Sequence, residues 1–420
     1  MSLRFGYTTG SCATAAAKAA AMGLFERYIP DEVEIDTPIG IKLRLKILNK
    51  QLSDNVSVCA VQKDAGDDPD VTNGCYVHAR VERNFSETIE IDGGEGVGRV
   101  TKPGLQIPVG HAAINPVPTR MIENAVREVI GKNTGAKVVI SVPNGKNLAG
   151  KTFNPRLGII GGISIIGTTV IVRPMSDDAF KTSLLCGLDI ARGIGYETVV
   201  LVPGNLGERS ILRLANIPKD QIIQISNFVG FMLDAARKRN FKKIILAGHP
   251  GKLVKLLRGD FNTHSTVSKP ANDILIDIIE RQVQNRDQGS GIMGQKPLSR
   301  NPTPNPRSPI PSKELVKNKR SSQDKSIIEG IPPSNAIFDS LKEVSTVEGI
   351  VELLRDYKSL SIMNDVAKQI EAKVVEYCKD ESPFAHPEAG VILFDMNGSI
   401  IGISDSAQTW LNLTITKSLS

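Results

Sequence analysis

The chain has 420 residues, 40% of them hydrophobic and 23% charged, and its formal net charge is +6. These proportions are typical of a globular enzyme with about two domains. Segment 281–335 contains ten Lys and Arg against four Asp and Glu, so the positive excess lies there and the rest of the chain is balanced. A nucleic-acid-binding surface is therefore not expected.

The cysteines form no CxxC pair and show no other metal-ligand spacing: they are Cys12, Cys59, Cys75, Cys186 and Cys378. An odd number of scattered cysteines indicates reduced thiols in a cytosolic protein. No apolar run reaches the roughly 18 residues of a membrane helix. Lys18 interrupts the alanine-rich N-terminal run, which argues against a signal peptide. We expect a cytoplasmic protein without a membrane partner, a disulfide scaffold or a metal site.

The N-terminal segment Thr8-Thr9-Gly10-Ser11 leads into an alanine-rich helix. Hydroxyls and unpaired backbone N–H groups at a helix start can bind a carboxylate or phosphate. The first interpretation therefore makes Thr8, Thr9 and Ser11 ligand contacts. The alternative is simple capping by Thr9 or Ser11.

Strictly alternating segments at 33–38 and 41–47 then predict half-buried antiparallel strands, and 56–61, 76–82 and 88–91 continue the series. The acidic turn 63–70 matches no EF-hand loop, so a solvated turn is favoured over a cation site. An irregular Gly- and Pro-rich loop follows, with Lys102 as a possible anion contact. A helix is predicted at 119–130 and a strand at 136–142, which makes this half an α+β domain.

Segment 155–180 has two apolar runs, 158–166 and 169–172, that predict a buried strand ending at Arg173-Pro174. Ser176 would cap the next helix, which starts with two acidic residues. Arg173 and this helix start together suit an anionic ligand. The alternative is a structural corner in which Arg173 pairs with a local carboxylate.

Three strand–loop–helix units follow, with strands at 198–202, 222–225 and 243–247, and they predict a small parallel sheet. Ligands of such sheets bind beyond the carboxyl ends of the strands, so the three loops should share one rim. None of the loops is a standard nucleotide motif. His249 and His264 are the histidines of this region, and each is either a catalyst or a structural hydrogen-bonding residue.

Segment 282–335 is poor in aromatic residues and rich in Pro, Asn, Ser and basic residues, which predicts a flexible insert. Helices are expected at 336–354 and 361–379, and a strand at 390–394. The predicted organisation is an α+β domain at 1–175, followed by an α/β domain at 176–281 plus 336–400. The insert at 282–335 interrupts the second domain, and residues 401–420 form a tail.

Four blocks in order resemble the cobalt-precorrin-5B C(1)-methyltransferases: FGYTTGSCATAAAKAA, TKPGLQIPVGHAAINPVPTRMI, GISIIGTTVIVRPMS and AGHPGKLVKLLRGDFNTHS. The resemblance covers roughly 3–280 and, more loosely, 336–400. It implies methyl transfer from S-adenosylmethionine to C1 of a cobalt-containing precorrin in anaerobic cobalamin biosynthesis. Cobalt would then enter only as part of the substrate. The insert 282–335 is longer than the family pattern. The oligomeric state stays undecided, and a homo-oligomer is possible.

Under this resemblance, candidate residues fall into three groups. The donor would be bound by Gly204, Asn205, Gly207, Glu208, Ser226 and Asn227. The substrate carboxylates would be bound by Thr8, Thr9, Ser11, Lys102, Arg173, Ser176 and Lys252. His249 or His264 would adjust the protonation of the macrocycle. Two alternatives remain: a non-catalytic tetrapyrrole carrier, and another small-molecule enzyme that uses the same loops.

Overall fold

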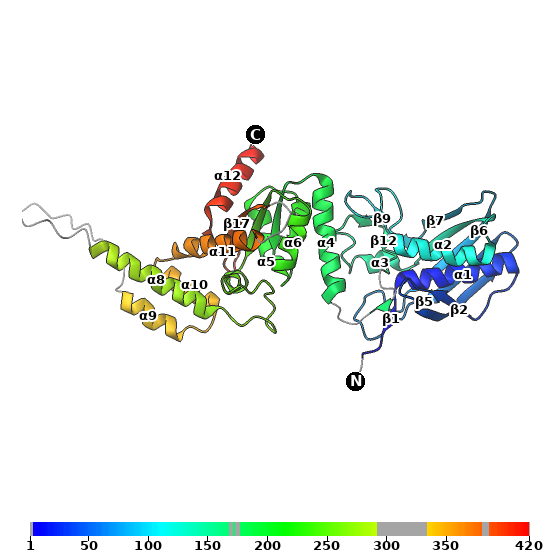
Figure 1. Cartoon of the computed structure of the whole chain (residues 1–420), viewed down its shortest axis with the longest axis horizontal. Coiled ribbons are helices and arrows are strands. Elements are labelled where there is room, and N and C mark those ends of the chain that lie inside the picture. Colours follow the sequence, from blue (N-terminus) through cyan, green and yellow to red (C-terminus); the bar gives the residue numbers. More distant parts are fainter. Residues whose placement is uncertain (1–2, 168–170, 173–176, 292–333, 380–385, 420) are drawn as a thin grey trace, which may run out of the picture. The chain divides into compact units, whose positions relative to one another are not determined.

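A computed structural model describes residues 3–167, 171–172, 177–291, 334–379 and 386–419. It has a mixed α and β fold with several sheets (Figure 1). The chain forms two compact units. The first is Met1–Leu201, Ile217–Ile244 and Glu381–Glu388, and the second is Val202–Asn216, Ile245–Asp380 and Ala389–Ser420. The domain bounds expected from the sequence stay a prediction.

The first unit contains a five-stranded sheet of order β4-β5-β6-β10-β7. Its strands are β4 (Leu48–Leu52), β5 (Val56–Gln62), β6 (Tyr76–Asn84), β7 (Ile89–Gly93) and β10 (Gly135–Ser141). The pairs β4–β5, β5–β6 and β6–β10 are antiparallel, and β10–β7 is parallel. Helix α2 (Pro116–Ile130) lies in the crossover between β7 and β10, as a parallel pair requires. Strands β2 (Glu32–Asp36) and β3 (Lys42–Lys46) form a separate antiparallel pair.

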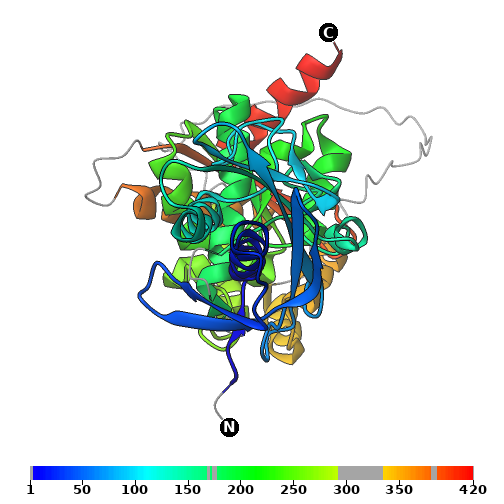
Figure 2. The same cartoon turned by 90° about the vertical axis from the view of Figure 1, so that its right-hand side faces the viewer.

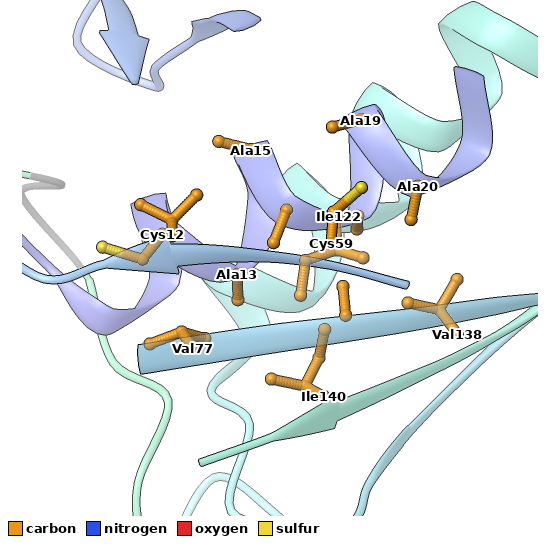
Figure 3. Close-up of a cluster of buried hydrophobic side chains, with 14 of the residues drawn as sticks. Cys12, Ala13, Ala15, Ala19, Ala20, Cys59, Val77, Ile122, Val138 and Ile140 are labelled. Atoms are coloured by element: carbon orange, nitrogen blue, oxygen red, sulfur yellow. The ribbon is translucent and has the colours of Figure 1, made fainter. Parts of the chain in front are cut away.

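Helix α1 (Thr9–Glu26) packs between this sheet and α2, and Figure 2 shows it end-on beside the strands. Its alanines are fully buried on every side of the helix, because both neighbours contact it. Figure 3 shows Ala13, Ala15 and Ala19 of the helix in the same core as Val77 and Ile140 of the sheet. Alanine is the best helix former and has the smallest apolar side chain, so it suits a helix in contact on all sides. The predicted alanine-packed helix is confirmed.

The expected continuous strand between 158 and 172 is wrong for the described residues. The segment is divided into β11 (Ile159–Ile160), β12 (Gly162–Ile163) and β13 (Ile171–Val172). These pair with β9 (Arg99–Val100), β8 (Gly96–Val97) and β1 (Gly6–Tyr7), respectively. The chain turns at Gly161, which has φ 88°. At Gly162 a Cβ atom would lie 2.1 Å from the Gly96 carbonyl oxygen, so only glycine allows this approach.

A second five-stranded sheet has the order β15-β14-β16-β17-β18, and β17 and β18 are antiparallel. Its strands are β14 (Thr198–Val202), β15 (Ile222–Gln224), β16 (Lys243–Gly248), β17 (Glu388–Phe394) and β18 (Ile400–Ile403). The remaining helices, with two short 3-10 turns, are α3 (Gly145–Ala149), α4 (Asp177–Ile194), α5 (Asn205–Leu214), η1 (Lys219–Gln221), α6 (Val229–Lys238), α7 (Pro250–Leu253), η2 (Val254–Arg258), α8 (Asn272–Gly291), α9 (Ser334–Glu343), α10 (Val347–Asp356), α11 (Ile362–Cys378) and α12 (Asp405–Leu419). In the described parts of the chain, no helix is long and apolar enough to cross a membrane.

Several elements differ from the sequence expectation. The helix expected at 336–354 is two helices, because Thr346 caps a new start by accepting a hydrogen bond from the Gly349 N–H. Helix α8 continues to Gly291, ten residues into the predicted insert, and residues 292–333 lie outside the described residues. The expected tail contains β18 and α12, whose Trp410 is 7% exposed and contributes to a core.

Candidate functional site

The hydroxyls at the start of α1 bond within the protein. Thr8 is the N-cap: its Oγ1 accepts a hydrogen bond from the Ser11 N–H at 3.2 Å and lies 3.0 Å from the Ser11 hydroxyl. Thr9 Oγ1 accepts from the Ile166 N–H at 2.9 Å. All three side chains are buried. The capping interpretation therefore describes the helix start, although the cap is Thr8 and not Thr9 or Ser11.

Lys102 also has a partner in the protein. Its Nζ lies 2.5 Å from Asp220 Oδ1, in an ion pair that is about one-quarter exposed on each side. It also donates to the Arg156 carbonyl oxygen at 3.3 Å. A carboxylate ligand would have to compete with Asp220 for this ammonium group. Arg173 and Ser176, the other candidates in this unit, lie outside the described residues.

The acidic turn 63–70 is explained by internal ion pairs. Arg4 binds Asp64 through both terminal nitrogens of its guanidinium group, and its backbone N–H donates to Asp67 Oδ2 at 2.6 Å. Lys63, with a side chain only 2% exposed, lies 2.5 Å from Asp70. In the described parts of the chain, no group of three or more His, Cys, Asp or Glu is placed to hold a metal ion. None of the five cysteines, all of which lie in the described residues, forms a disulfide bond.

In the second unit, the start of α5 meets the residues that follow β16. Gly204 is the N-cap of the helix, has an extended conformation with φ 176°, and as a glycine offers no side-chain cap. A Cβ atom built on Gly204 would meet no atom within 4 Å, so the backbone faces open space. Lys252 donates to the Pro203 carbonyl oxygen at 3.4 Å, which places its ammonium group beside this turn. Burial, and then the charge of Lys255, lowers the pKa of Lys252.

The other two donor candidates on α5 are more enclosed. A Cβ atom on Gly207 would lie 2.7 Å from the Ala247 carbonyl oxygen and 3.1 Å from Val202 Cβ. This glycine is therefore required for α5 to pack against the ends of β14 and β16. Glu208 is 7% exposed, and both it and Asn205 have interaction partners within the protein. Gly204 is thus the candidate with room for a ligand against its backbone.

His249 has both ring nitrogens occupied. Its Nδ1 accepts a hydrogen bond from the Gly251 N–H at 3.0 Å, so the ring proton is on Nε2. Nε2 then donates to Glu348 Oε2 at 2.8 Å. The second oxygen of Glu348 accepts from the Met396 N–H at 3.3 Å. Sequence reasoning missed Glu348, because 99 residues separate it from His249 and no motif marks it.

His264 differs because its side chain lies in an exposed loop. Its Nδ1 accepts from the Thr266 N–H at 3.3 Å and lies 2.7 Å from the Thr266 hydroxyl. Nε2 is then the ring nitrogen of His264 that could exchange a proton with a ligand. Of the two histidines, His264 has the more accessible ring.

Ser226 and Asn227 lie in the first unit, directly before α6. Ser226 has a left-handed backbone with φ 53°, and Asn227 has an interaction partner.

A cavity of about 660 Å³ opens elsewhere in the first unit, between α2 and the β2–β3 turn. Its lining includes Arg120, Asn124 and Lys132, and none of the predicted site residues contributes to it.

Comparison with known proteins decides the family. A family model described as CbiD matches residues 1–174, and a model described as CbiD, C-terminal domain, matches residues 331–405. The chain is 53% identical over 273 residues to cobalt-precorrin-5B C(1)-methyltransferase of Alkaliphilus metalliredigens, covering 65% of this chain and 72% of that relative. This chain belongs to the CbiD family. The predicted resemblance is confirmed.

Other CbiD relatives match with similar coverage. The cobalt-precorrin-5B C(1)-methyltransferase of Thermoanaerobacter sp. is 50% identical over 273 residues, covering 65% of this chain and 74% of the relative. That of Klebsiella pneumoniae is 48% identical over 274 residues, covering 65% and 72%. A crystal structure of the cobalamin biosynthesis protein cbiD from Archaeoglobus fulgidus is 28% identical, covers 62% of this chain and 82% of that one, and gives a TM-score of 0.34.

Proposed function

We propose that this protein methylates C1 of cobalt-precorrin-5B, giving cobalt-precorrin-6A, with S-adenosylmethionine as the methyl donor. The observation that carries this proposal is the 53% identity over 273 residues to a relative named for that reaction. The donor supplies a methyl group already activated on a sulfonium. The S–CH3 bond breaks as the C1–CH3 bond forms, and the electron pair stays on the sulfur of a neutral thioether.

The start of α5 has features that suit the donor. Gly204 faces open space, this N-cap glycine offers no side-chain cap, and the Lys252 ammonium group lies beside it. The positive end of a helix dipole and a nearby cation favour a carboxylate such as that of the methionyl group. Asn205 and Glu208 remain proposed contacts for the rest of the donor, and Ser226 and Asn227 remain proposed contacts in the first unit.

The remaining assignments are proposals of the same kind. Alignment of donor and acceptor supplies most of the rate in such a transfer, so no side chain needs to dominate. His264, with its accessible ring, is the stronger candidate to move a proton on the macrocycle. His249 would instead hold the turn at residues 249–253 against Glu348. We further propose a cytoplasmic enzyme whose partner is the cobalt-containing tetrapyrrole.

Isothermal titration with S-adenosylhomocysteine tests the donor site. The wild-type protein should bind in the micromolar range, and the variant Gly204→Val, Asn205→Ala should lose binding while remaining folded at the titration temperature. Equal binding by both proteins would retain the methyltransferase and refute this donor site. Absence of binding to the wild type, even with a corrinoid precursor present, would favour the non-catalytic carrier.

A further inference from the structure

Four phenylalanines and one lysine gather in the first unit, outside the residues discussed above. Phe153 lies between α3 and β11, Phe180 and Lys181 lie in the first turns of α4, and Phe228 and Phe231 lie at the start of α6. These five residues are called the aromatic cluster. The whole chain has only 12 Phe, so this gathering from three separate segments is unusual for it.

Three rings of the cluster form a chain of direct contacts. The centroids of Phe153 and Phe180 are 6.4 Å apart, and those of Phe180 and Phe228 are 6.0 Å apart in an edge-to-face arrangement. Phe228 is 8% exposed, whereas Phe153, Phe180 and Phe231 are 46%, 37% and 37% exposed. The buried ring of Phe228 thus contacts Phe180, and Phe180 in turn contacts Phe153. A contiguous exposed aromatic surface typically marks a binding site.

Lys181 adds a positive charge within this surface. Its Nζ lies 5.1 Å from the ring centroid of Phe228 and 5.8 Å from that of Phe231, both within the range of cation–π attraction. Among the described residues, Lys181 forms an ion pair with Asp178, whose carboxylate lies 3.8 Å from Nζ and is 94% exposed. Such a long, solvated ion pair holds the ammonium group only weakly. The cluster thus combines aromatic faces with a cation that a ligand can engage.

A large conjugated ring bearing carboxylates has the matching chemistry. Its faces stack on phenylalanine rings, and its acidic side chains pair with an ammonium group. We propose that the aromatic cluster binds one face of the tetrapyrrole substrate, with Lys181 paired to one of its carboxylates. This inference rests on the proposed function, which supplies the class of substrate.

The test uses the full-length protein and uroporphyrin, a fluorescent tetrapyrrole with carboxylate side chains. The variant Phe180→Leu, Phe231→Leu keeps apolar side chains but removes two rings, and should raise the Kd for uroporphyrin about tenfold. Lys181→Gln should raise it several-fold and reduce its dependence on salt. Asp178→Asn should tighten binding, because it removes a repelling carboxylate next to Lys181. Phe85→Leu is the matched control, because Phe85 is fully exposed and lies outside the cluster.

Titration with S-adenosylhomocysteine, run on the same variants, separates this inference from the proposed function. Unchanged binding of S-adenosylhomocysteine together with weaker uroporphyrin binding in the cluster variants alone would support the inference. Uroporphyrin affinity equal in cluster and control variants would overturn it, and would leave the methyltransferase untouched. A cluster variant that instead changes the sedimentation coefficient would overturn it in favour of contact between two copies of the chain. If the wild type does not bind S-adenosylhomocysteine, this counts against the proposed function. The uroporphyrin titration would still show whether the aromatic cluster binds a tetrapyrrole.

Discussion

Gly204 and Gly207 are three residues apart in the proposed donor site, yet the structure gives them opposite roles. A Cβ atom at Gly204 enters open space, whereas one at Gly207 comes within 2.7 Å of the Ala247 carbonyl oxygen. Contacts below 3.0 Å to a backbone atom cannot be relieved by rotating a side chain. Substitution of Gly207 must therefore move α5 away from β16.

The magnitudes follow from this difference. Gly207→Ala overpacks the interface between α5 and the strands and should cost about 1–3 kcal/mol of unfolding free energy. For a unit of about 150–250 residues, each kcal/mol lowers the melting temperature by about 2–4 °C. Gly204→Ala should cost less than about 1 kcal/mol, since its backbone is extended and glycine is only a modest N-cap. Gly204→Val should keep this stability and weaken S-adenosylhomocysteine binding, because its methyl groups fill the open space.

Thermal unfolding monitored by circular dichroism measures the first effect, and isothermal titration measures the second. The two substitutions should have different effects. Gly207→Ala should lower the melting temperature, and Gly204→Val should lower the affinity for S-adenosylhomocysteine. Equal melting temperatures for Gly207→Ala and the wild type would contradict the close approach of α5 and β16. Full affinity in Gly204→Val would show that the open space beside Gly204 is not where the donor binds.

Two further predictions concern the first unit. Asp70→Asn should destabilise the protein by about 3–5 kcal/mol in urea unfolding, because it leaves a buried ammonium group unpaired. Lys63→Met should cost less, because the carboxylate that it leaves is partly exposed. Equal losses of unfolding free energy in the two variants would contradict this. Burial acts to raise the pKa of Asp70, but Lys63 and the hydrogen bonds from Thr72 outweigh burial and hold that pKa below its usual value. The ion pair therefore stabilises the fold at pH values above the ordinary carboxyl pKa. This stabilisation is lost as the pH falls through the lowered pKa of Asp70. Burial raises the pKa of Cys12 to about 12, so mass spectrometry should find Cys12 unmodified after iodoacetamide treatment of the native protein at about pH 8 and modified after unfolding. Rapid native modification of Cys12 would contradict its buried position.

The local pattern of the sequence was sufficient for much of the fold. Strict alternation at 33–38 and 41–47, and the segments 56–61 and 76–82 that continue the series, predicted strands that the structure contains, because one face of each strand must be buried. The alanine run predicted α1 through the high helix propensity of alanine, which is also a local property. The family was also decided by sequence, since the four blocks that carry the resemblance are contiguous runs of residues that lie along the chain in the expected order.

Other features depended on contacts between distant residues. The pairing of His249 with Glu348, and of Lys102 with Asp220, joins positions 99 and 118 apart. The sequence could propose these side chains as ligand contacts, but it could not show that the protein itself already occupies them. Glycine is equally ambiguous, because its sequence letter is the same whether it admits a ligand, as proposed for Gly204, or a neighbouring strand, as at Gly207. Tertiary packing alone decides which atoms lie in the space that a missing side chain leaves.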